Sequence, residues 1–325
     1  RRPPRFTLFP YTTLFRSGTA NAATTIPAGS INNYNMNVDG GTYQLAGDVV
    51  ATATALTAGA NNVTLDGMGY NIRFANSSAG YAVYCNGKNN ITLMNFTAST
   101  VGTSANSYGL YIYNCEDVDI DDVYVTSPTS SALYLRGSSN SNISNSTLVS
   151  TSGTAVYHND AENNNFNDVD ITSGSGYGLY DYLSSFNSFE RCSIISGTSS
   201  AIQLPASSSN ISLRNCTIES SAASKATINM LDTFNATIDN SNITASTSIA
   251  LYMTRTDAAG LGTRNCTISN NDITASGTAQ ALYVYWGINN TIHDNVCIAQ
   301  TSNCAYLSNR SEEQTSELQS PNTIS

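Results

Sequence analysis

The chain has 325 residues, of which 11% are charged and 40% hydrophobic, and its net charge is −10. This composition is too apolar for a disordered chain, and the acidic excess argues against nucleic-acid binding, which needs clustered Lys and Arg. No apolar run reaches the length of a membrane-spanning helix, so we expect no membrane span.

The two ends of the chain differ from its middle. Residues 1–17 hold four Arg and three Pro, and residues 310–325 hold three Glu. Both segments resemble translated sequencing-adapter sequence, and both carry an Arg-Ser pair where they meet the middle (Arg16-Ser17 and Arg310-Ser311). We therefore expect 1–17 and 310–325 to be adapter artefacts and 18–309 to be one domain, a fragment of a longer chain. A natural basic leader and acidic tail are the alternative.

The middle of the chain is a repeat. One aliphatic or aromatic anchor residue recurs every 23–30 residues, at Leu65, Leu93, Ile120, Ile143, Phe166, Phe189, Leu213, Ile238, Ile268 and Ile292. The residue that lies five positions after the anchor is also apolar in most coils. It continues a period-2 alternation, which indicates a strand rather than a helix. A repeat of this length is typical of a solenoid, in which each unit packs only on its neighbours.

Residues that tolerate a left-handed backbone flank each anchor. Asn or Asp stands three residues before nine of the ten anchors, with Phe186 as the exception, and Gly, Asn or Asp stands two residues after nine, with Arg191 as the exception. These residue types adopt the positive φ that a sharp bend requires. The two columns predict a bend on each side of a very short strand.

A third strand in each unit has the pattern small–aliphatic–Tyr, as in Ala132-Leu133-Tyr134 and Ala155-Val156-Tyr157. Three short strands per unit predict an all-β fold, a single-stranded parallel β-helix of about ten coils of roughly 23–30 residues. The segment Gly41–Ile72, followed by repeats such as NNITLMNF, resembles the right-handed parallel β-helix repeat family, which includes pectin-lyase-like enzymes and NosD-like proteins. The resemblance covers about 40–309 and implies the right-handed winding. One such scaffold carries many functions, so the fold does not fix the activity.

The tyrosines of the third strand form the most regular outward column. Tyr111, Tyr134, Tyr157 and Tyr180 occupy it in successive coils, and Tyr182 lies two residues further along the same face. We predict either that the rings stack on one another and cover the sheet, or that they form a sugar-binding platform with Asp160 at its edge.

Two polar residues interrupt the inward position that follows this tyrosine. His158 and Asp181 occupy it in successive coils, and Arg136 lies just past the same strand one coil earlier. A His–carboxylate pair with a nearby Arg would suit general acid–base catalysis on an acidic sugar, which is one hypothesis. The alternative is a hydrogen-bonded pair without catalytic function, inside the solenoid or at a loop rim, because an unpaired polar group there costs about 1–3 kcal/mol.

The densest acidic run is Glu116–Asp122, in which Asp119 and Asp121 point outward on one strand. Oxygen clusters of this kind suit calcium, and pectate-lyase relatives bind calcium through strand carboxylates. The run therefore predicts either a calcium site or a solvated acidic edge. No other cofactor is expected.

Seven cysteines are present, without a paired Cys-x-x-Cys motif, so we expect no zinc site. Cys192 and Cys216 share one inward column on adjacent coils and are expected to form a disulfide or to pack as thiols. Cys85, Cys266 and Cys297 also fall in inward columns, which favours packing.

These features lead to three hypotheses for function. The first is a non-catalytic extracellular or cell-surface module that contacts glycans or other surface molecules. The second is a pectin-lyase-like polysaccharide lyase, hydrolase or epimerase, and the third is a NosD-like periplasmic accessory protein. A solenoid cut within its array exposes strand edges, so we also expect end-to-end self-association.

Overall fold

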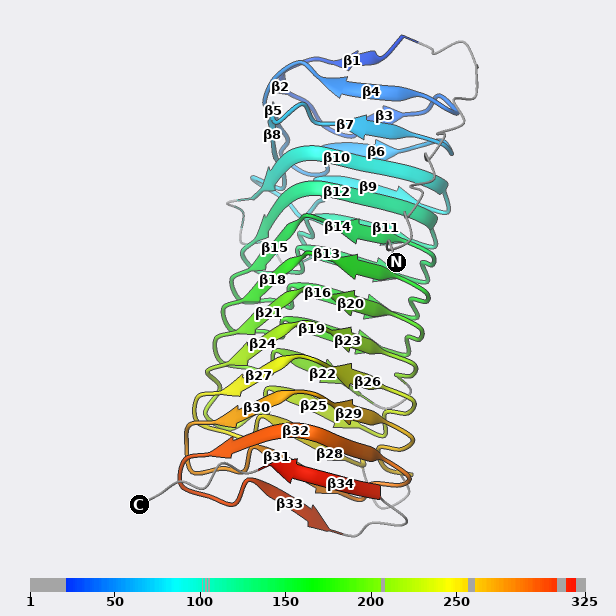
Figure 1. Cartoon of the computed structure of the whole chain (residues 1–325). Helices are drawn as coiled ribbons and strands as arrows, with labels where there is room; N and C mark the ends of the chain where they lie inside the picture. The colour runs from blue at the N-terminus through cyan, green and yellow to red at the C-terminus, as the bar shows by residue number, and fades with distance from the viewer. Residues whose placement is uncertain are drawn as a thin grey trace, which may run out of the picture.

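The computed structural model describes residues 22–308, apart from 101, 103, 105, 206–207 and 257–260, together with the backbone of 314–319. The described residues form strands, turns and bends and contain no helix, and so none that could cross a membrane. The strands stack as successive turns of one elongated parallel solenoid (Figure 1), as the repeat predicts. Segment 1–17 lies outside the described residues. Of segment 310–325 only the backbone of 314–319 is described, and it pairs in parallel with the preceding turn.

One sheet consists of the small–aliphatic–Tyr strands. It has 12 strands, each hydrogen-bonded to the equivalent strand of the next coil. In order these are β3 (Tyr34–Met36), β6 (Leu56–Ala58), β9 (Val83–Asn86), β11 (Leu110–Tyr113), β13 (Leu133–Arg136), β16 (Val156–Asn159), β19 (Leu179–Tyr182), β22 (Ile202–Leu204), β25 (Ile228–Leu231), β28 (Leu251–Thr254), β31 (Leu282–Tyr285) and β33 (Ala305–Ser308).

The other sheet holds the two remaining strand segments of every coil and has 22 strands. The segments before the bend are β1 (Thr24–Ile26), β4 (Thr42–Leu45), β7 (Thr64–Asp66), β14 (Asn142–Ser144), β17 (Asn165–Asn167), β20 (Ser188–Glu190), β23 (Ser212–Arg214), β26 (Thr237–Asp239), β29 (Thr267–Ser269) and β34 (Gln314–Gln319). The segments after it are β2 (Gly29–Ser30), β5 (Val49–Val50), β8 (Asn71–Arg73), β15 (Thr147–Ser150), β18 (Asp170–Ser173), β21 (Ser193–Ser196), β24 (Thr217–Ser220), β27 (Asn242–Ala245) and β30 (Asp272–Ala275). Three strands run through the bend without a break, namely β10 (Asn89–Ser99), β12 (Glu116–Ser127) and β32 (Thr291–Ala299).

The solenoid has about 12 turns, two more than the anchor residues indicate. Both extra turns precede Leu65. Tyr43 pairs with Leu65 and Thr24 pairs with Tyr43, so an aromatic residue and a threonine take the anchor position there. These anchors lie 19 and 22 residues apart, closer than the 23–30 residues of the other coils, and one of them is polar, so the repeat pattern does not reveal the two coils.

The bend columns have the predicted backbone. All ten residues three positions before the anchors have φ between 51° and 58°. Nine of the ten residues two positions after the anchors have φ between 49° and 58°, and in the remaining coil Met68 and Gly69 take the positive φ in place of Gly67. Asparagine amides also pair between coils, since Asn90 Nδ2 donates to Asn62 Oδ1 at 2.8 Å.

One coil places bulky residues in this unfavourable conformation. Leu183, Phe186 and Arg191 have φ of 52°, 58° and 53°. For a residue with a Cβ the left-handed region costs about 1–2 kcal/mol, and Asn and Asp visit it more readily than such bulky residues. Phe186 is also 56% exposed, so burial in the core does not offset that cost.

The cysteines do not pair as expected. Disulfides join Cys85 to Cys115 and Cys297 to Cys304, so the prediction that Cys85 and Cys297 pack as thiols is wrong. Cys115 lies in the turn after β11, where its Cα comes within 6.7 Å of the Cα of Cys85, close enough for a disulfide. Cys192 and Cys216 are buried free thiols. Two disulfides indicate an oxidising, extracytoplasmic environment.

Candidate functional site

The outward tyrosines form a continuous stack, which we call the tyrosine ladder. Its members lie in direct register on β9, β11, β13, β16 and β19: Tyr84, Tyr111, Tyr134, Tyr157 and Tyr180. Ring centroids from Tyr111 to Tyr180 are 5.0 Å apart at each step, with interplanar angles of 19–33°. Gln203 and Asn229 follow in the next two coils, so the ladder ends at Tyr180.

This stacking determines which parts of the rings a ligand can reach. Tyr157 has a ring on each side, Tyr134 and Tyr180, so both of its faces are covered. Burial, reinforced by the neighbouring phenols, raises the pKa of Tyr157 to about 12. The ring edges and hydroxyl groups remain outside. The ladder therefore matches the expected stacking of ring on ring, and its inner members offer no free face to a sugar.

Three predicted site residues lie at the edge of this sheet. The Arg136 guanidinium lies over the ring of Tyr113, 5.3 Å from its centroid. Tyr182 lies 6.3 Å from Tyr180 between centroids, and Asp160 is an exposed turn residue with φ of 57°. All three are at the surface.

His158 and Asp181 lie inside the solenoid. They are paired residues of β16 and β19, and both side chains are 0% exposed. His158 Nδ1 is 2.7 Å from Asp181 Oδ1, and Asn187 Nδ2 donates to the same oxygen at 3.1 Å. The imidazole packs beside the ring of Phe166, 5.3 Å away between centroids.

The predicted catalytic group is thus divided by the wall of the solenoid. His158 and Asp181 are brought together, as predicted, but Arg136 is exposed on the outer side. His158 Nε2 and Asp181 Oδ2 are buried without a hydrogen-bond partner. A substrate on the surface reaches neither atom in this structure, so the geometry favours the hydrogen-bonded interior pair over the catalytic hypothesis.

The two carboxylates proposed for calcium act as acceptors between coils. Asn142 Nδ2 donates to Asp119 Oδ1 at 3.0 Å, and Ser144 Oγ donates to Asp121 Oδ1 at 2.7 Å. Hydrogen bonds from Ser144 and Asn145 lower the pKa of Asp121. Among the described residues, no three His, Cys, Asp or Glu side chains form a group that could hold a metal ion.

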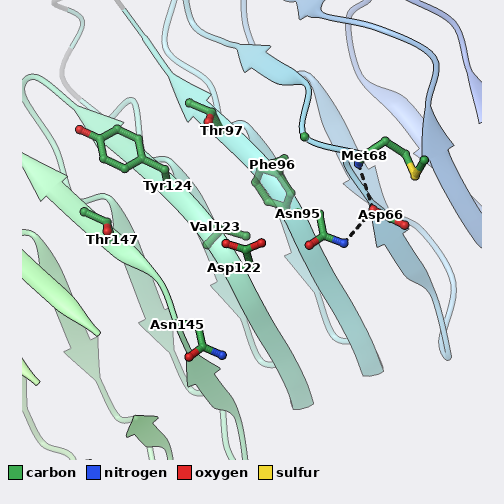
Figure 2. Close-up of a pocket in the computed structure, with 11 residues that line it drawn as sticks. Asp66, Met68, Asn95, Phe96, Thr97, Asp122, Val123, Tyr124, Asn145 and Thr147 are labelled. Carbon is green, nitrogen blue, oxygen red and sulfur yellow. Dashed lines mark hydrogen bonds between the residues drawn. The ribbon is translucent and has the colours of Figure 1, made fainter. Parts of the chain in front are cut away.

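A surface groove of about 600 Å³ runs along the second bend of the coils, the bend that follows each anchor residue. Figure 2 shows it crossing neighbouring coils, with polar side chains at each step. Its lining consists of Asp66, Met68, Gly69, Asn95, Phe96, Thr97, Asp122, Val123, Tyr124, Asn145 and Thr147. Asp66 Oδ1 accepts hydrogen bonds from Met68 N at 2.9 Å and Asn95 Nδ2 at 3.1 Å.

Tyr124 is the unusual residue of this groove. It pairs with Thr97 on one side and Thr147 on the other, so no ring lies above or below it in its column (Figure 2). The side chain is 46% exposed. In contrast to the inner rings of the tyrosine ladder, Tyr124 presents an aromatic face that no ring in its column covers, and Asp122 of the same strand is also exposed. Tyr124 is not among the site residues predicted from the sequence, although an aromatic residue between two threonines is visible in the repeat.

Comparison with known proteins supports the fold. Residues 81–228 match the family model described as "Right handed beta helix region", so this stretch is a right-handed β-helix. None of the curated proteins matches the chain.

Solved structures of similar fold include two epimerase modules and the catalytic domain of a glucanase. The A-module of the Azotobacter vinelandii mannuronan C-5 epimerase AlgE6 has a TM-score of 0.65 at 12% identity, with 92% of each chain covered. The AlgE4 A-module from the same organism has a TM-score of 0.52 at 15% identity, with 90% of each covered. The catalytic domain of a GH87 α-1,3-glucanase in complex with nigerose has a TM-score of 0.60 at 12% identity. There 92% of this chain is aligned but only 64% of the glucanase chain is spanned. At these identities the likeness concerns the pectin-lyase-like fold alone.

Proposed function

We propose that this chain is a non-catalytic β-helix module that binds saccharides, and that the groove along the second bend is its binding site. The observation that carries the proposal is Tyr124, whose 46% exposed ring stands between two threonines in a groove of about 600 Å³. An aromatic ring that is not covered by its neighbours can pack against the apolar face of a sugar ring.

The polar residues of the groove supply the second half of such a site. Sugar hydroxyls are both donors and acceptors, and a binding site orients them with a few placed polar groups. The exposed carboxylate of Asp122 can accept hydroxyl donors. Asn145 donates through Nδ2 to Asp121, which leaves its carbonyl oxygen as a further acceptor.

The charge of the groove selects among saccharides. Its lining includes Asp66 and Asp122 and no Lys or Arg. Like charges in proximity disfavour binding, so uronate chains are disfavoured and neutral saccharides are preferred.

The similar structures support a saccharide as the ligand class. The glucanase domain holds nigerose, and the two A-modules are named for epimerisation of mannuronan. The two disulfides support action outside the cytoplasm, in the extracellular space, at the cell surface or in the periplasm.

The test is calorimetric titration of the folded chain with neutral and uronic-acid oligosaccharides. Loss of the Tyr124 ring removes about 1–1.5 kcal/mol of contact, so Tyr124→Ala is expected to weaken binding of neutral oligosaccharides about tenfold. Ile298→Ala is the control for loss of an exposed large apolar side chain, because Ile298 is 42% exposed and lies on β32, away from the groove.

Unchanged affinity in Tyr124→Ala, or no binding of any saccharide, would overturn the proposal. Preferential binding of uronates would overturn its charge argument. Release of reducing ends or unsaturated products during the titration would show an enzyme instead of a binding module.

A further inference from the structure

The tyrosine ladder has one open end. Tyr84 is its first member, and the residue in register with it in the preceding coil is Thr57. Tyr81 lies beside Tyr84, 5.3 Å away between centroids at an interplanar angle of 26°, so the two rings end the stack together. Tyr81 follows Thr54 in its own column, since Tyr81 N donates to Thr54 Oγ1 at 3.3 Å.

A hollow lies where the aromatic stack stops. It has a volume of about 460 Å³ and is lined by Asn32, Asn33, Ala53, Thr54, Tyr81 and Tyr84. These residues come from three successive coils, and the bulky rings of Tyr81 and Tyr84 give way to the smaller Ala53 and Thr54 in the preceding coil and to Asn32 and Asn33 in the coil before that. The step in side-chain length creates the hollow and exposes the terminal rings.

The opposite end of the ladder is closed. Gln203 follows Tyr180 in register and is only 6% exposed, and Asn229 Nδ2 donates to Gln203 Oε1 at 2.9 Å. A ligand therefore has access to ring faces of the stack at the Tyr84 end and not at the Tyr180 end.

The amide groups of the hollow point to the kind of ligand. Asn33 Oδ1 accepts a hydrogen bond from Thr57 Oγ1 at 2.6 Å, and Asn32 Oδ1 accepts one from Thr52 N at 2.8 Å. With their oxygens engaged in this way, the two Nδ2 groups have no hydrogen-bond partner among the described residues. They are donors available to a ligand.

We infer that this hollow, which we call the ladder-end pocket, is a second saccharide site that takes a neutral sugar ring. The sugar lies against the faces of Tyr81 and Tyr84, and its hydroxyl oxygens accept from the amides of Asn32 and Asn33. No charged residue lines the pocket, so neither a uronate nor an amino sugar gains an ion pair there. The inference rests on the proposed function only for the class of ligand, because the pocket and the groove share no residue.

The experiment uses Thr57→Tyr, which extends the ladder by one ring and fills the pocket without removing a side chain from the core. The probes are neutral tetrasaccharides of glucose and of mannose, and the readouts are calorimetric affinity and stoichiometry, with tyrosine ring NMR shifts to locate binding. Tyr124→Ala, Thr57→Tyr and the double variant are compared with the unmodified chain, and far-UV circular dichroism confirms that each is folded.

We expect two sites in the unmodified chain, of which Tyr124→Ala weakens the groove about tenfold and Thr57→Tyr removes the pocket, so the double variant keeps only the weakened groove. Binding to Tyr124→Ala that Thr57→Tyr then abolishes supports the pocket, even if the groove proves inactive. Binding that Tyr124→Ala alone removes completely overturns the pocket and leaves the groove. Saccharide binding that Thr57→Tyr leaves unchanged in the Tyr124→Ala background also overturns it, and absence of binding throughout overturns both sites.

Discussion

Replacing Tyr157 by alanine separates the structural function of the tyrosine ladder from ligand binding. Tyr157 is stacked between Tyr134 and Tyr180 with centroid distances of 5.0 Å on each side. Each aromatic pair contributes about 0.5–1.5 kcal/mol beyond the area it buries, so the loss of two pairs costs about 1–3 kcal/mol. Tyr124→Ala removes a ring of the same size that has no aromatic neighbour, and it serves as the reference.

The assay is urea unfolding followed by circular dichroism, with free energies taken from midpoints and slopes. We expect Tyr157→Ala to lower the free energy of unfolding by about 1–3 kcal/mol more than Tyr124→Ala does. Tyr157→Phe keeps the ring and should remain close to the unmodified chain. A double-mutant cycle between Tyr157 and Tyr180 should give a coupling of about 0.5–1.5 kcal/mol. Equal losses in Tyr157→Ala and Tyr124→Ala, with no coupling, would refute the stacking argument.

Four further perturbations test other parts of the structure. His158→Leu should destabilise the fold by about 1–3 kcal/mol, because the buried Asp181 then keeps only Asn187 as a hydrogen-bond donor, whereas leucine at both positions of the pair should restore stability in urea unfolding. Breaking the Cys85–Cys115 disulfide, which closes a loop of 30 residues, should cost about 3.6 kcal/mol, measured with the double Ser variant. Phe186→Asn should raise the free energy of unfolding by up to about 1 kcal/mol, because Asn accepts positive φ more readily, and a thermal melt that falls instead would contradict this. Burial raises the pKa of Tyr157 to about 12 from its ordinary 10, so the unfolded chain loses this proton at a lower pH than the folded chain. The contribution of Tyr157 to the free energy of unfolding is therefore fully present below pH 10 and is lost as the pH rises toward 12. Two pH units correspond to about 2.7 kcal/mol, which solvent screening of this half-buried ring reduces to about 1 kcal/mol, and Tyr157→Phe should remove that part of the pH dependence.

The sequence predicts the bends well, because they depend on single residues. Positive φ is accessible to Asn, Asp and Gly for local steric reasons, so columns of these residues identify turns without any knowledge of the packing. Even Phe186 and Arg191, which depart from the pattern, adopt the bend of their columns. The fold imposes the positive φ on these two residues although they do not favour it. The bend of this coil could therefore be predicted from the equivalent residues of the other coils.

The interior pair was predictable for a similar reason. His158 and Asp181 are 23 residues apart in coils of equal length, so they lie side by side whatever the remaining residues do. Arg136 stands one position later in its strand, in register with Asn159 and not with His158, so the period-2 alternation of β13 turns it to the outer side of the wall. That one difference separates an interior hydrogen bond from a surface site.

The disulfides and the groove could not be predicted from the sequence, because each depends on side chains from different columns of the repeat. Cys85 belongs to a strand and Cys115 to the turn after the next strand, so no single column places them together. The groove likewise needs the relative sizes of residues in four neighbouring coils. A short Thr97 and Thr147 beside Tyr124 leave the ring uncovered, and only the register shows that they are its neighbours.

A repeated side chain in a solenoid covers itself. When coils are stacked in register at the strand spacing of about 4.8 Å, identical rings lie face to face, and the regularity that makes a tyrosine column conspicuous also removes its ring faces from solvent. A free aromatic face arises only where the repeat is interrupted, either by a lone ring among small residues, such as Tyr124, or at the end of a stack, such as Tyr84. The two proposed saccharide sites accordingly lie at exceptions to the repeat, whereas the stacked rings of the ladder hold the coils together.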